Sequence, residues 1–495
     1  MKILGRLEKS KDFWFALITS FIFFLLRLPS LFEPYWYGDE GIYQTIGIAL
    51  SQGKLLYRDI FDNKPPLIYL LYSLFNSDQF TIRLVSVIFG VLSVIAFFLL
   101  ARKLFSKFKT NNRFACYLST AFFSFVFGLP LIEGNIANAE NFMLLPIILS
   151  ALLIVNQKQS KNSFLAGLLL GIAFLFKVVA VFDFAALFLF ISFVFLNNLQ
   201  KHLKIKEAAK ALGKQLFPFA FGFLLPIGLT CLFFLLRGAF SDFLNATLST
   251  NVGYVGYGNK LFGIPQGLLV VKFLALAIFS VIIFIKKERL GLTSIFVLLW
   301  FSFSLFNAFF SERPYGHYLL VLLPSFSLLL GLFITSNKFK QIYLVFILSS
   351  LLLILKNFSF YPLEKNVLYY VNIFSFITGK QNLISYQSFF DKKTPIDYEI
   401  AQFIKPRVKT TDSIFIWGNN AQVYKLIGAV PPGKYLVAYH MVNYHDGLIN
   451  TKIALEKKKP KFIITMPDQA PIPFSLANYF HKINIDNASI YERFF

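Results

Sequence analysis

Two adjacent acidic residues, Asp39 and Glu40, lie in a polar segment near the start of the chain, with lysine and arginine residues nearby. A carboxylate can accept the proton of an attacking hydroxyl group, and cationic side chains can stabilise a phosphate as it leaves. Neighbouring side chains rarely point at one spot. We therefore expect Asp39 to be the base, and Glu40 to position the acceptor or a cationic partner. The alternative is an ordinary solvated acidic pair near a helix end.

The elements that must position this pair are membrane spans. Of the 495 residues 56% are hydrophobic, the mean hydropathy is +0.62, and the apolar residues form runs long enough to cross a bilayer. Windows of roughly 20 residues predict about eleven spans, and hence an all-α polytopic membrane protein. The expected spans are approximately 13–32, 82–101, 114–131, 139–156, 163–178, 180–197, 216–236, 266–285, 290–310, 317–335 and 341–356.

The formal net charge of +23 fits the same interpretation. Most Lys and Arg residues lie in short links between apolar runs, which is typical of cytoplasmic loops and not of a nucleic-acid-binding face. We therefore exclude nucleic acid and expect contacts with anionic membrane lipids. The run at 13–32 is too long for a signal peptide, so we expect a retained span in the cytoplasmic membrane with the N-terminus in the cytoplasm.

The chain changes in character after residue 356, where charged residues, proline and short apolar runs alternate. Residues 413–417, 435–439 and 461–465 are predicted strands, and residues 397–404 a predicted helix. We therefore expect a transmembrane domain at 1–356 and a small α/β domain at 357–495. An odd number of spans places this second domain outside the cytoplasm.

The link between the first two spans, residues 33–80, carries the acidic pair. Apolar residues at helical spacing within 41–50 predict an interfacial amphipathic helix, and Trp36 and Tyr37 suit the head-group level. Asp39 and Glu40 would then lie at the membrane surface, where a sugar on a polyprenyl phosphate presents its reactive carbon. Transfer of that sugar to a hydroxyl group needs the base and the cations considered above.

The order and spacing of motifs in this link resemble the GT-C glycosyltransferase superfamily, specifically its dolichyl-phosphate-mannose–protein mannosyltransferase and aminoarabinose-transferase group. The resemblance covers residues 1 to about 150 by motif and the rest by architecture. The matching elements are Gly38-Asp39-Glu40-Gly41-Ile42-Tyr43, Ala49 to Gly53, Asp62-Asn63-Lys64-Pro65-Pro66-Leu67 and Arg83-Leu84. It implies an inverting, polyprenyl-phosphate-dependent transferase that needs no metal or other cofactor.

The resemblance assigns roles within the first link. The catalytic base falls on Asp39, with Glu40 beside it, and the lysine that binds the lipid phosphate falls on Lys64. Arg83 opens the second span as a further phosphate ligand, although both cations could instead be snorkelling interfacial residues. The remaining candidates belong to the matching elements and would line the substrate cavity: Tyr43 and Asp62.

Later links add four candidates. Glu140 heads the fourth predicted span, where the resemblance places an acidic residue facing the donor cavity. Arg313 and His317 would contact the leaving phosphate, although a lone interfacial histidine is often structural. Tyr257 lies in the Gly- and Tyr-rich link 237–265, which is either a mobile lid over the sugar or a simple connector.

Other classes of function are less well supported. The histidines are scattered without a ligand pattern, and there is no P-loop or dinucleotide fingerprint, which favours a lipid-linked donor over a nucleotide sugar. A transporter or lipid flippase is the main alternative. Transporters usually carry polar groups at the bilayer midplane in repeated halves, whereas this acidic pair is interfacial and its link is not repeated. The acceptor could be a lipid, a glycan or a protein.

Overall fold

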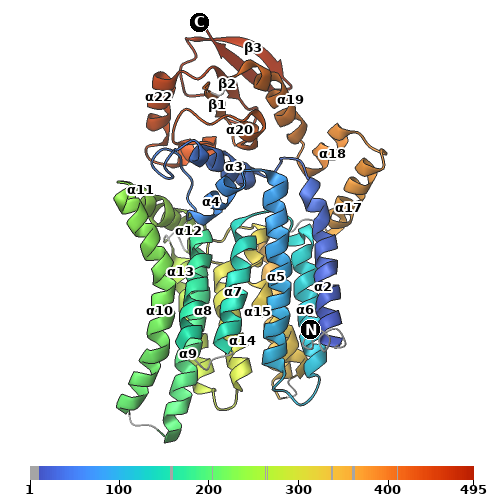
Figure 1. The fold of residues 1–495 in the computed structure, drawn as a ribbon, viewed down its shortest axis with the longest axis vertical. Coiled ribbons are helices and arrows are strands. Elements are labelled where there is room, and N and C mark those ends of the chain that lie inside the picture. The colour runs from blue at the N-terminus through green and yellow to red at the C-terminus, as the bar shows by residue number, and fades with distance from the viewer. Residues whose placement is uncertain are drawn as a thin grey trace, which may run out of the picture. The chain divides into compact units, whose positions relative to one another are not determined.

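The computed structural model describes residues 11–155, 160–202, 205–261, 264, 266–335, 338–358, 363–409 and 411–494 (Figure 1). The chain forms two compact units. The helical unit contains Met1–Leu28, Val85–Phe233 and Thr250–Asn366, and the mixed unit contains Pro29–Leu84, Phe234–Ser249 and Val367–Phe495. The mixed unit thus combines the first link with the C-terminal part of the chain. The predicted domains 1–356 and 357–495 stay a prediction.

The helical unit is built from apolar helices that run alongside one another (Figure 1). They are α2 (Lys11–Arg27), most of α5 (Gln79–Phe105), α6 (Asn112–Gly128), α7 (Ala139–Val155), α8 (Ser160–Phe176), α9 (Val181–His202), most of α10 (Ile205–Leu236), α12 (Thr250–Gly258), α13 (Gly267–Ile285), α14 (Leu292–Ala308), α15 (Leu323–Thr335) and α16 (Lys340–Asn357). Many large apolar side chains are exposed, including Val270, Phe273 and Ile278 of α13. Such a surface suits lipid, which is as apolar as these side chains.

Five helices of the described chain are long and apolar enough to cross a membrane: Lys11–Phe32, Gln79–Phe105, Leu212–Leu236, Gly267–Ile285 and Lys340–Asn357. Shorter apolar helices lie at Ala139–Val155, Lys161–Phe176, Val178–Val194, Leu292–Ala308 and Leu323–Thr335. The prediction of a mostly helical membrane protein is confirmed. The number of spans, about eleven, stays a prediction.

The mixed unit contains short helices and a small sheet. Its first link forms η1 (Leu28–Phe32), α3 (Gly38–Ser51), α4 (Leu67–Leu74) and the start of α5. The middle segment forms α11 (Phe240–Leu244) and η4 (Asn245–Ser249). The C-terminal part forms α17 (Leu363–Ile377), α18 (Leu383–Phe390), α19 (Thr394–Ile404), η6 (Lys405–Arg407), β1 (Ile414–Trp417), α20 (Gln422–Ile427), α21 (Ala438–Asn443), α22 (Gly447–Lys458), β2 (Phe462–Thr465), β3 (Tyr479–Ile485) and β4 (Ala488–Arg493).

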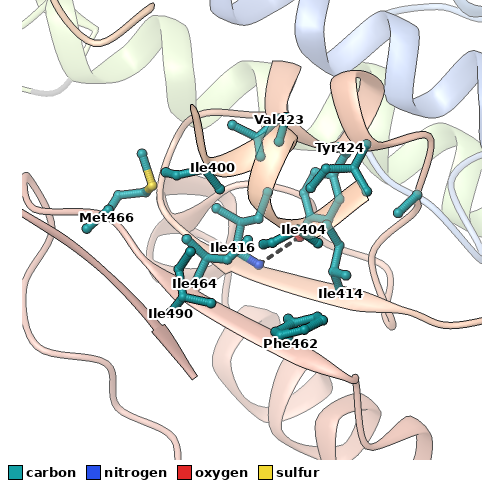
Figure 2. Packing of buried hydrophobic residues seen from close by; sticks show 14 residues of the cluster. Ile400, Ile404, Ile414, Ile416, Val423, Tyr424, Phe462, Ile464, Met466 and Ile490 are labelled. Atoms are coloured by element: carbon teal, nitrogen blue, oxygen red, sulfur yellow. Dashed lines mark hydrogen bonds between the residues drawn. The ribbon is translucent and has the colours of Figure 1, made fainter. Parts of the chain in front are cut away.

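The four strands form one sheet in the order β1-β2-β4-β3, in which β1 and β2 are parallel and the other two pairs are antiparallel. Helices α19 and α20 pack on it through a buried apolar cluster (Figure 2). Its labelled members are Ile400, Ile404, Ile414, Ile416, Val423, Tyr424, Phe462, Ile464, Met466 and Ile490. The hydroxyl of Tyr424 accepts a hydrogen bond of 3.0 Å from the amide of Ile416, which fixes α20 against β1.

The small C-terminal α/β fold was predicted, and so were β1, β2 and α19. The predicted strand at 435–439 is wrong. Its amide at Ala438 donates to the carbonyl of Gly418, just beyond the end of β1, and residues 438–443 continue as α21. This segment therefore crosses the end of β1 instead of pairing beside it. The β3–β4 hairpin was not predicted, because most side chains of β3 are exposed and show no regular apolar alternation.

Candidate active site

Helix α3 carries the acidic pair in its first turn. The chain enters from Tyr37 in an extended conformation, and the amide of Gly41 closes the first turn onto the carbonyl of Tyr37 at 3.1 Å. Acidic residues here interact favourably with the positive end of the helix dipole. The predicted helix at 41–50 is confirmed, but it is mostly covered by protein, with Glu40 through Gly47 all buried.

A close approach of α3 to α20 depends on Gly41. A Cβ atom at Gly41 would lie 2.5 Å from the amide nitrogen and 3.0 Å from the Cα of Gln422. One turn later, the hydroxyl of Thr45 donates to the carbonyl of Ala421 at 3.1 Å. The C-terminal part of the chain is therefore in direct contact with the turn that carries Asp39.

Asp39 and Lys64 form a partly exposed ion pair. The Lys64 Nζ atom lies 3.3 Å from Asp39 Oδ2, and their side chains are 16% and 29% exposed. The Tyr43 hydroxyl, one helical turn after Asp39, donates to the same oxygen at 3.2 Å. Lys64 Nζ also lies 5.0 Å from the centre of the Tyr43 ring. One carboxylate and one ammonium group thus meet where solvent reaches both.

Asp62 is a buried second carboxylate beside Lys64. Its Oδ2 atom accepts a hydrogen bond of 2.7 Å from Tyr69 and lies 3.9 Å from Lys64 Nζ. The Lys64 backbone is fixed on both sides, because its carbonyl accepts from Tyr57 at 2.7 Å and its amide donates to Tyr69 at 3.2 Å. Burial, followed by the charge of Asp62, raises the pKa values of both tyrosines well above their usual range, so both stay neutral donors.

Glu40 faces a different cation, Arg83, in the interior of the mixed unit. Arg83 donates to both Glu40 oxygens, at 3.1 and 2.5 Å, and to the carbonyl of Ser30 at 2.7 Å. Its Nη1 atom also lies 2.8 Å from Glu33, which accepts from Tyr369 at 2.6 Å. The side chain of Arg83 is fully buried. Its guanidinium is therefore held by two carboxylates, Glu33 and Glu40.

The candidates from later links lie in the helical unit. His317 Nδ1 is 2.7 Å from Glu133, and its Nε2 is 3.8 Å from Glu140. Glu140 also pairs with Lys177, whose Nζ lies 4.3 Å from the centre of the Tyr318 ring. The segment after α14, which contains Pro314, places Arg313 half-buried. The backbone of Tyr257 belongs to α12, whereas its side chain lies outside the described residues.

The site candidates are thus divided between the two units. Asp39, Glu40, Tyr43, Asp62, Lys64 and Arg83 gather in the mixed unit, and Glu140, Tyr257, Arg313 and His317 belong to the helical unit. Within the described ranges, no group of three His, Cys, Asp or Glu residues could hold a metal ion. The roles assigned to all ten residues stay predictions.

Sequence reasoning missed several partners in the mixed unit. Glu33 and Tyr369 complete the surroundings of Arg83, and Tyr57 and Tyr69 hold the segment around Lys64. His440 was noted only as lacking a metal-ligand pattern, but its Nε2 atom lies 3.5 Å from Asp62 Oδ1. The ring of His440 is 1% exposed. Tyr369 and His440 are far from the first link in sequence, and no local pattern indicates these contacts.

Residues 64–221 match the family described as dolichyl-phosphate-mannose-protein mannosyltransferase. This segment is mannosyltransferase-like. The match begins at Lys64 and includes Arg83 and Glu140, and the resemblance inferred from the motifs is confirmed. Together with the five helices long and apolar enough to cross a membrane, this match indicates an integral membrane protein with a glycosyltransferase-like segment. No curated protein matches the sequence.

Two solved structures are similar to the chain at low sequence identity. The oligosaccharyltransferase of Archaeoglobus fulgidus in the apo form is 13% identical, with a TM-score of 0.48 over 92% of this chain and 69% of that one. ArnT from Cupriavidus metallidurans bound to undecaprenyl phosphate is 11% identical, with a TM-score of 0.44 over 97% of this chain and 98% of that one.

Proposed function

We propose that this protein transfers a sugar from a polyprenyl-phosphate donor to an acceptor hydroxyl group, with Asp39 as the general base. The observation that carries this proposal is the Asp39–Lys64 pair, in which Lys64 Nζ lies 3.3 Å from Asp39 Oδ2 and both side chains are partly exposed. A base and a cation side by side match the two charges that develop when a hydroxyl group displaces a phosphate. The mannosyltransferase-like segment supports the same chemistry.

The reaction is a single displacement. The acceptor oxygen attacks the anomeric carbon while Asp39 takes the hydroxyl proton. The bond between that carbon and the phosphate oxygen breaks, and its electron pair leaves with the lipid phosphate. The Lys64 ammonium stabilises this developing charge, as an ammonium group does at phosphoryl oxygens. Because attack and departure occur on opposite sides of the carbon, the product has the inverted configuration.

Other polar and charged groups of the mixed unit support this arrangement. Tyr43 donates to Asp39 and orients its carboxylate. Arg83, buried and held by Glu33 and Glu40, anchors the start of α3, so we assign Glu40 to positioning α3 and not to proton transfer. Arg313, His317, Glu140 and Tyr257 belong to the helical unit, and the roles that the resemblance gives them stay predictions.

The first link and the C-terminal α/β part would lie on the extracytoplasmic side of the cytoplasmic membrane, with the N-terminus in the cytoplasm. The basic links between apolar runs support this orientation. Labelling of single cysteines introduced at exposed positions 53 and 486 by a membrane-impermeant reagent in intact cells tests it. Labelling only after the membrane is broken would overturn the orientation.

A transfer assay tests the activity. The purified full chain is incubated with polyprenyl phosphoryl hexoses and pentoses and an extract of envelope lipids and glycans, and labelled products are separated. We expect transfer by the wild type, and a loss of about 100-fold or more in Asp39→Asn. Asp59→Asn is the matched control, because Asp59 is an exposed acid of the same link paired with Arg58. Full activity of Asp39→Asn would end the assignment, and substrate movement without any glycosylated product would favour a transporter.

A further inference from the structure

A buried histidine from the C-terminal part of the chain lies against the carboxylate behind Lys64. His440 belongs to α21, and its Nε2 atom is 3.5 Å from Asp62 Oδ1. Neither ring nitrogen of His440 has a hydrogen-bond partner in the described structure, although the ring is 1% exposed. A buried polar group without a hydrogen bond is costly, and such groups are often functional.

The contact is built into the packing of the mixed unit. The amide of Phe61 donates to the carbonyl of Lys434 at 2.9 Å, which fixes the segment before α21 to the first link. The Phe61 ring then packs edge-on against His440, with ring centres 5.5 Å apart, and the Tyr444 ring contacts both His440 at 5.4 Å and Phe61 at 4.8 Å. The imidazole is therefore held beside Asp62 and cannot swing into solvent without breaking these contacts.

When Lys64 binds a donor phosphate, the buried carboxylate of Asp62 beside His440 loses its ammonium partner. In the resting site one ammonium group lies between two carboxylates, 3.3 Å from Asp39 and 3.9 Å from Asp62. When Lys64 moves to a donor phosphate, the contacts of Asp62 that remain among the described residues are the hydrogen bond from Tyr69 and the approach of His440. A buried carboxylate without a cation is strongly unfavourable, so a proton is expected to bind nearby.

From this geometry we infer that His440 is a positioning residue that takes up one proton when the donor phosphate draws Lys64 away from Asp62. The protonated imidazole replaces the Lys64 ammonium as the partner of Asp62, so that Lys64 can stay bound to the donor phosphate. The inference rests on the proposed function and deepens it. It makes donor binding dependent on pH and gives the C-terminal part of the chain a role in the site.

The charges near His440 act on its pKa in the direction that this inference requires. The pKa of His440 is lowered to about 4, chiefly by burial and in part by the charge of Lys64, against the opposing effects of Asp62 and Asp39. From its own segment the phenols of Tyr439 and Tyr444 contact the ring, Tyr435 contacts Tyr444, and the ammonium of Lys434 lies over Phe61. Departure of Lys64 removes one opposing charge and leaves Asp62, so donor binding raises this pKa and takes up a proton.

The test measures donor binding against pH. Polyprenyl phosphoryl mannose is the probe, because its phosphodiester keeps one negative charge throughout the range. For the wild-type full chain we expect the dissociation constant to rise with pH by up to about tenfold per unit, starting above about pH 4. This rise of the dissociation constant with pH should vanish in His440→Gln. It should persist in His445→Gln, because His445 is an exposed histidine in the same segment. A slope that persists in His440→Gln and vanishes in Asp62→Asn would place the proton on Asp62 and overturn the inference.

A second measurement needs no variant. Calorimetric titration of the wild type with the same probe, in two buffers of different ionisation enthalpy, gives the number of protons bound with the donor. We expect a value approaching one near pH 5.5, and a value of zero across the range would overturn the inference. Absence of both binding and transfer with every polyprenyl phosphoryl sugar would instead count against the proposed function, so the two failures are distinguishable.

Discussion

Asp39 and Glu40 are neighbours in the chain, yet their carboxylates bind different cations. Asp39 Oδ2 lies 3.3 Å from Lys64 Nζ, with 29% of its side chain exposed, whereas Glu40 contacts Arg83 at 2.5 Å and is 2% exposed. Successive residues of an α-helix point about 100° apart, because one turn takes 3.6 residues. Helix α3 therefore directs one acid to solvent and the other into the interior of the mixed unit.

Substitution of the two acids should separate catalysis from stability. We expect Asp39→Asn to lower kcat by roughly 100-fold to 10,000-fold, because loss of a general base removes that much rate, with little change in unfolding temperature. Glu40→Gln should lower the free energy of unfolding by roughly 3 kcal/mol, because it leaves Arg83 with one buried carboxylate fewer. Kinetics and thermal unfolding of the detergent-solubilised chain measure both. A stable but inactive Glu40→Gln protein would instead assign Glu40 to the chemistry.

Arg83 and Lys64 are both candidates for the donor phosphate, and their burial predicts different effects. Arg83→Gln leaves Glu33 and Glu40 without their shared cation, so we expect roughly 3–5 kcal/mol of destabilisation. Lys64→Gln should raise the KM for the donor and cost less stability than Arg83→Gln, because its pair with Asp39 is partly exposed and its loss leaves only Asp62 as a buried carboxylate without the ammonium.

The triple variant Arg83→Met with Glu33→Gln and Glu40→Gln serves as the control for Arg83. Removing the whole buried charge cluster should restore much of the stability that Arg83→Gln loses, because no carboxylate remains uncompensated. If the triple variant is stable but binds donor as weakly as Lys64→Gln, Arg83 itself contacts the phosphate.

The contact between α3 and α20 can be tested at one atom. Gly41→Ala would bring a Cβ within 2.5 Å of the Gln422 backbone nitrogen, so the two helices must separate. We expect roughly 1–3 kcal/mol of destabilisation, as for overpacked sites, together with reduced transfer. Gly38→Ala is the matched control, because a Cβ at Gly38 has no atom within 4 Å. Equal stability and equal transfer in the two variants would show that the position of α3 does not depend on its contact with α20.

Most of the correct predictions came from local sequence patterns, that is, from runs and spacings of apolar residues. Apolar runs predicted a helical membrane protein because bilayer thickness fixes the length of a span. The helix at 41–50 followed from its spacing of apolar residues, and β1 and β2 from short apolar segments. The adjacency of Asp39 and Lys64 was expected only through the resemblance, since 25 residues separate them and spacing alone does not fix their distance.

The remaining features depend on contacts between distant segments. Arg83 resembled a snorkelling residue at the start of a span, and only the fold brings Glu33 and Glu40 around it. His440 was one of five scattered histidines, and its contact with Asp62 arises because the segment before α21 pairs with Phe61. The strand predicted at 435–439 was wrong for the same reason, because its apolar residues pack against the first link instead of forming a strand.

The stability of the mixed unit should decrease as pH rises through the acid range, because of Asp397. This carboxylate is fully buried at the start of α19 and accepts hydrogen bonds from Asn420 at 2.8 Å and Gln422 at 2.7 Å. Burial raises its pKa from the usual value of 3.8 to about 7, against the effect of these donors. Between these values the folded protein binds a proton that the unfolded chain has lost. The free energy of unfolding therefore falls with rising pH, by at most roughly 1.4 kcal/mol per unit.

Asp397→Asn should remove this dependence, because an amide does not titrate between pH 4 and 7. Thermal unfolding of the full chain across that range measures it, with Asp486→Asn, an exposed acid in the β3–β4 turn, as the control. We expect a flatter profile in Asp397→Asn and an unchanged one in Asp486→Asn. Gln422 packs against Gly41, so loosening of this hydrogen-bonded turn above pH 7 should also lower transfer. A profile that is equally steep in Asp397→Asn would place the titrating group elsewhere in the unit.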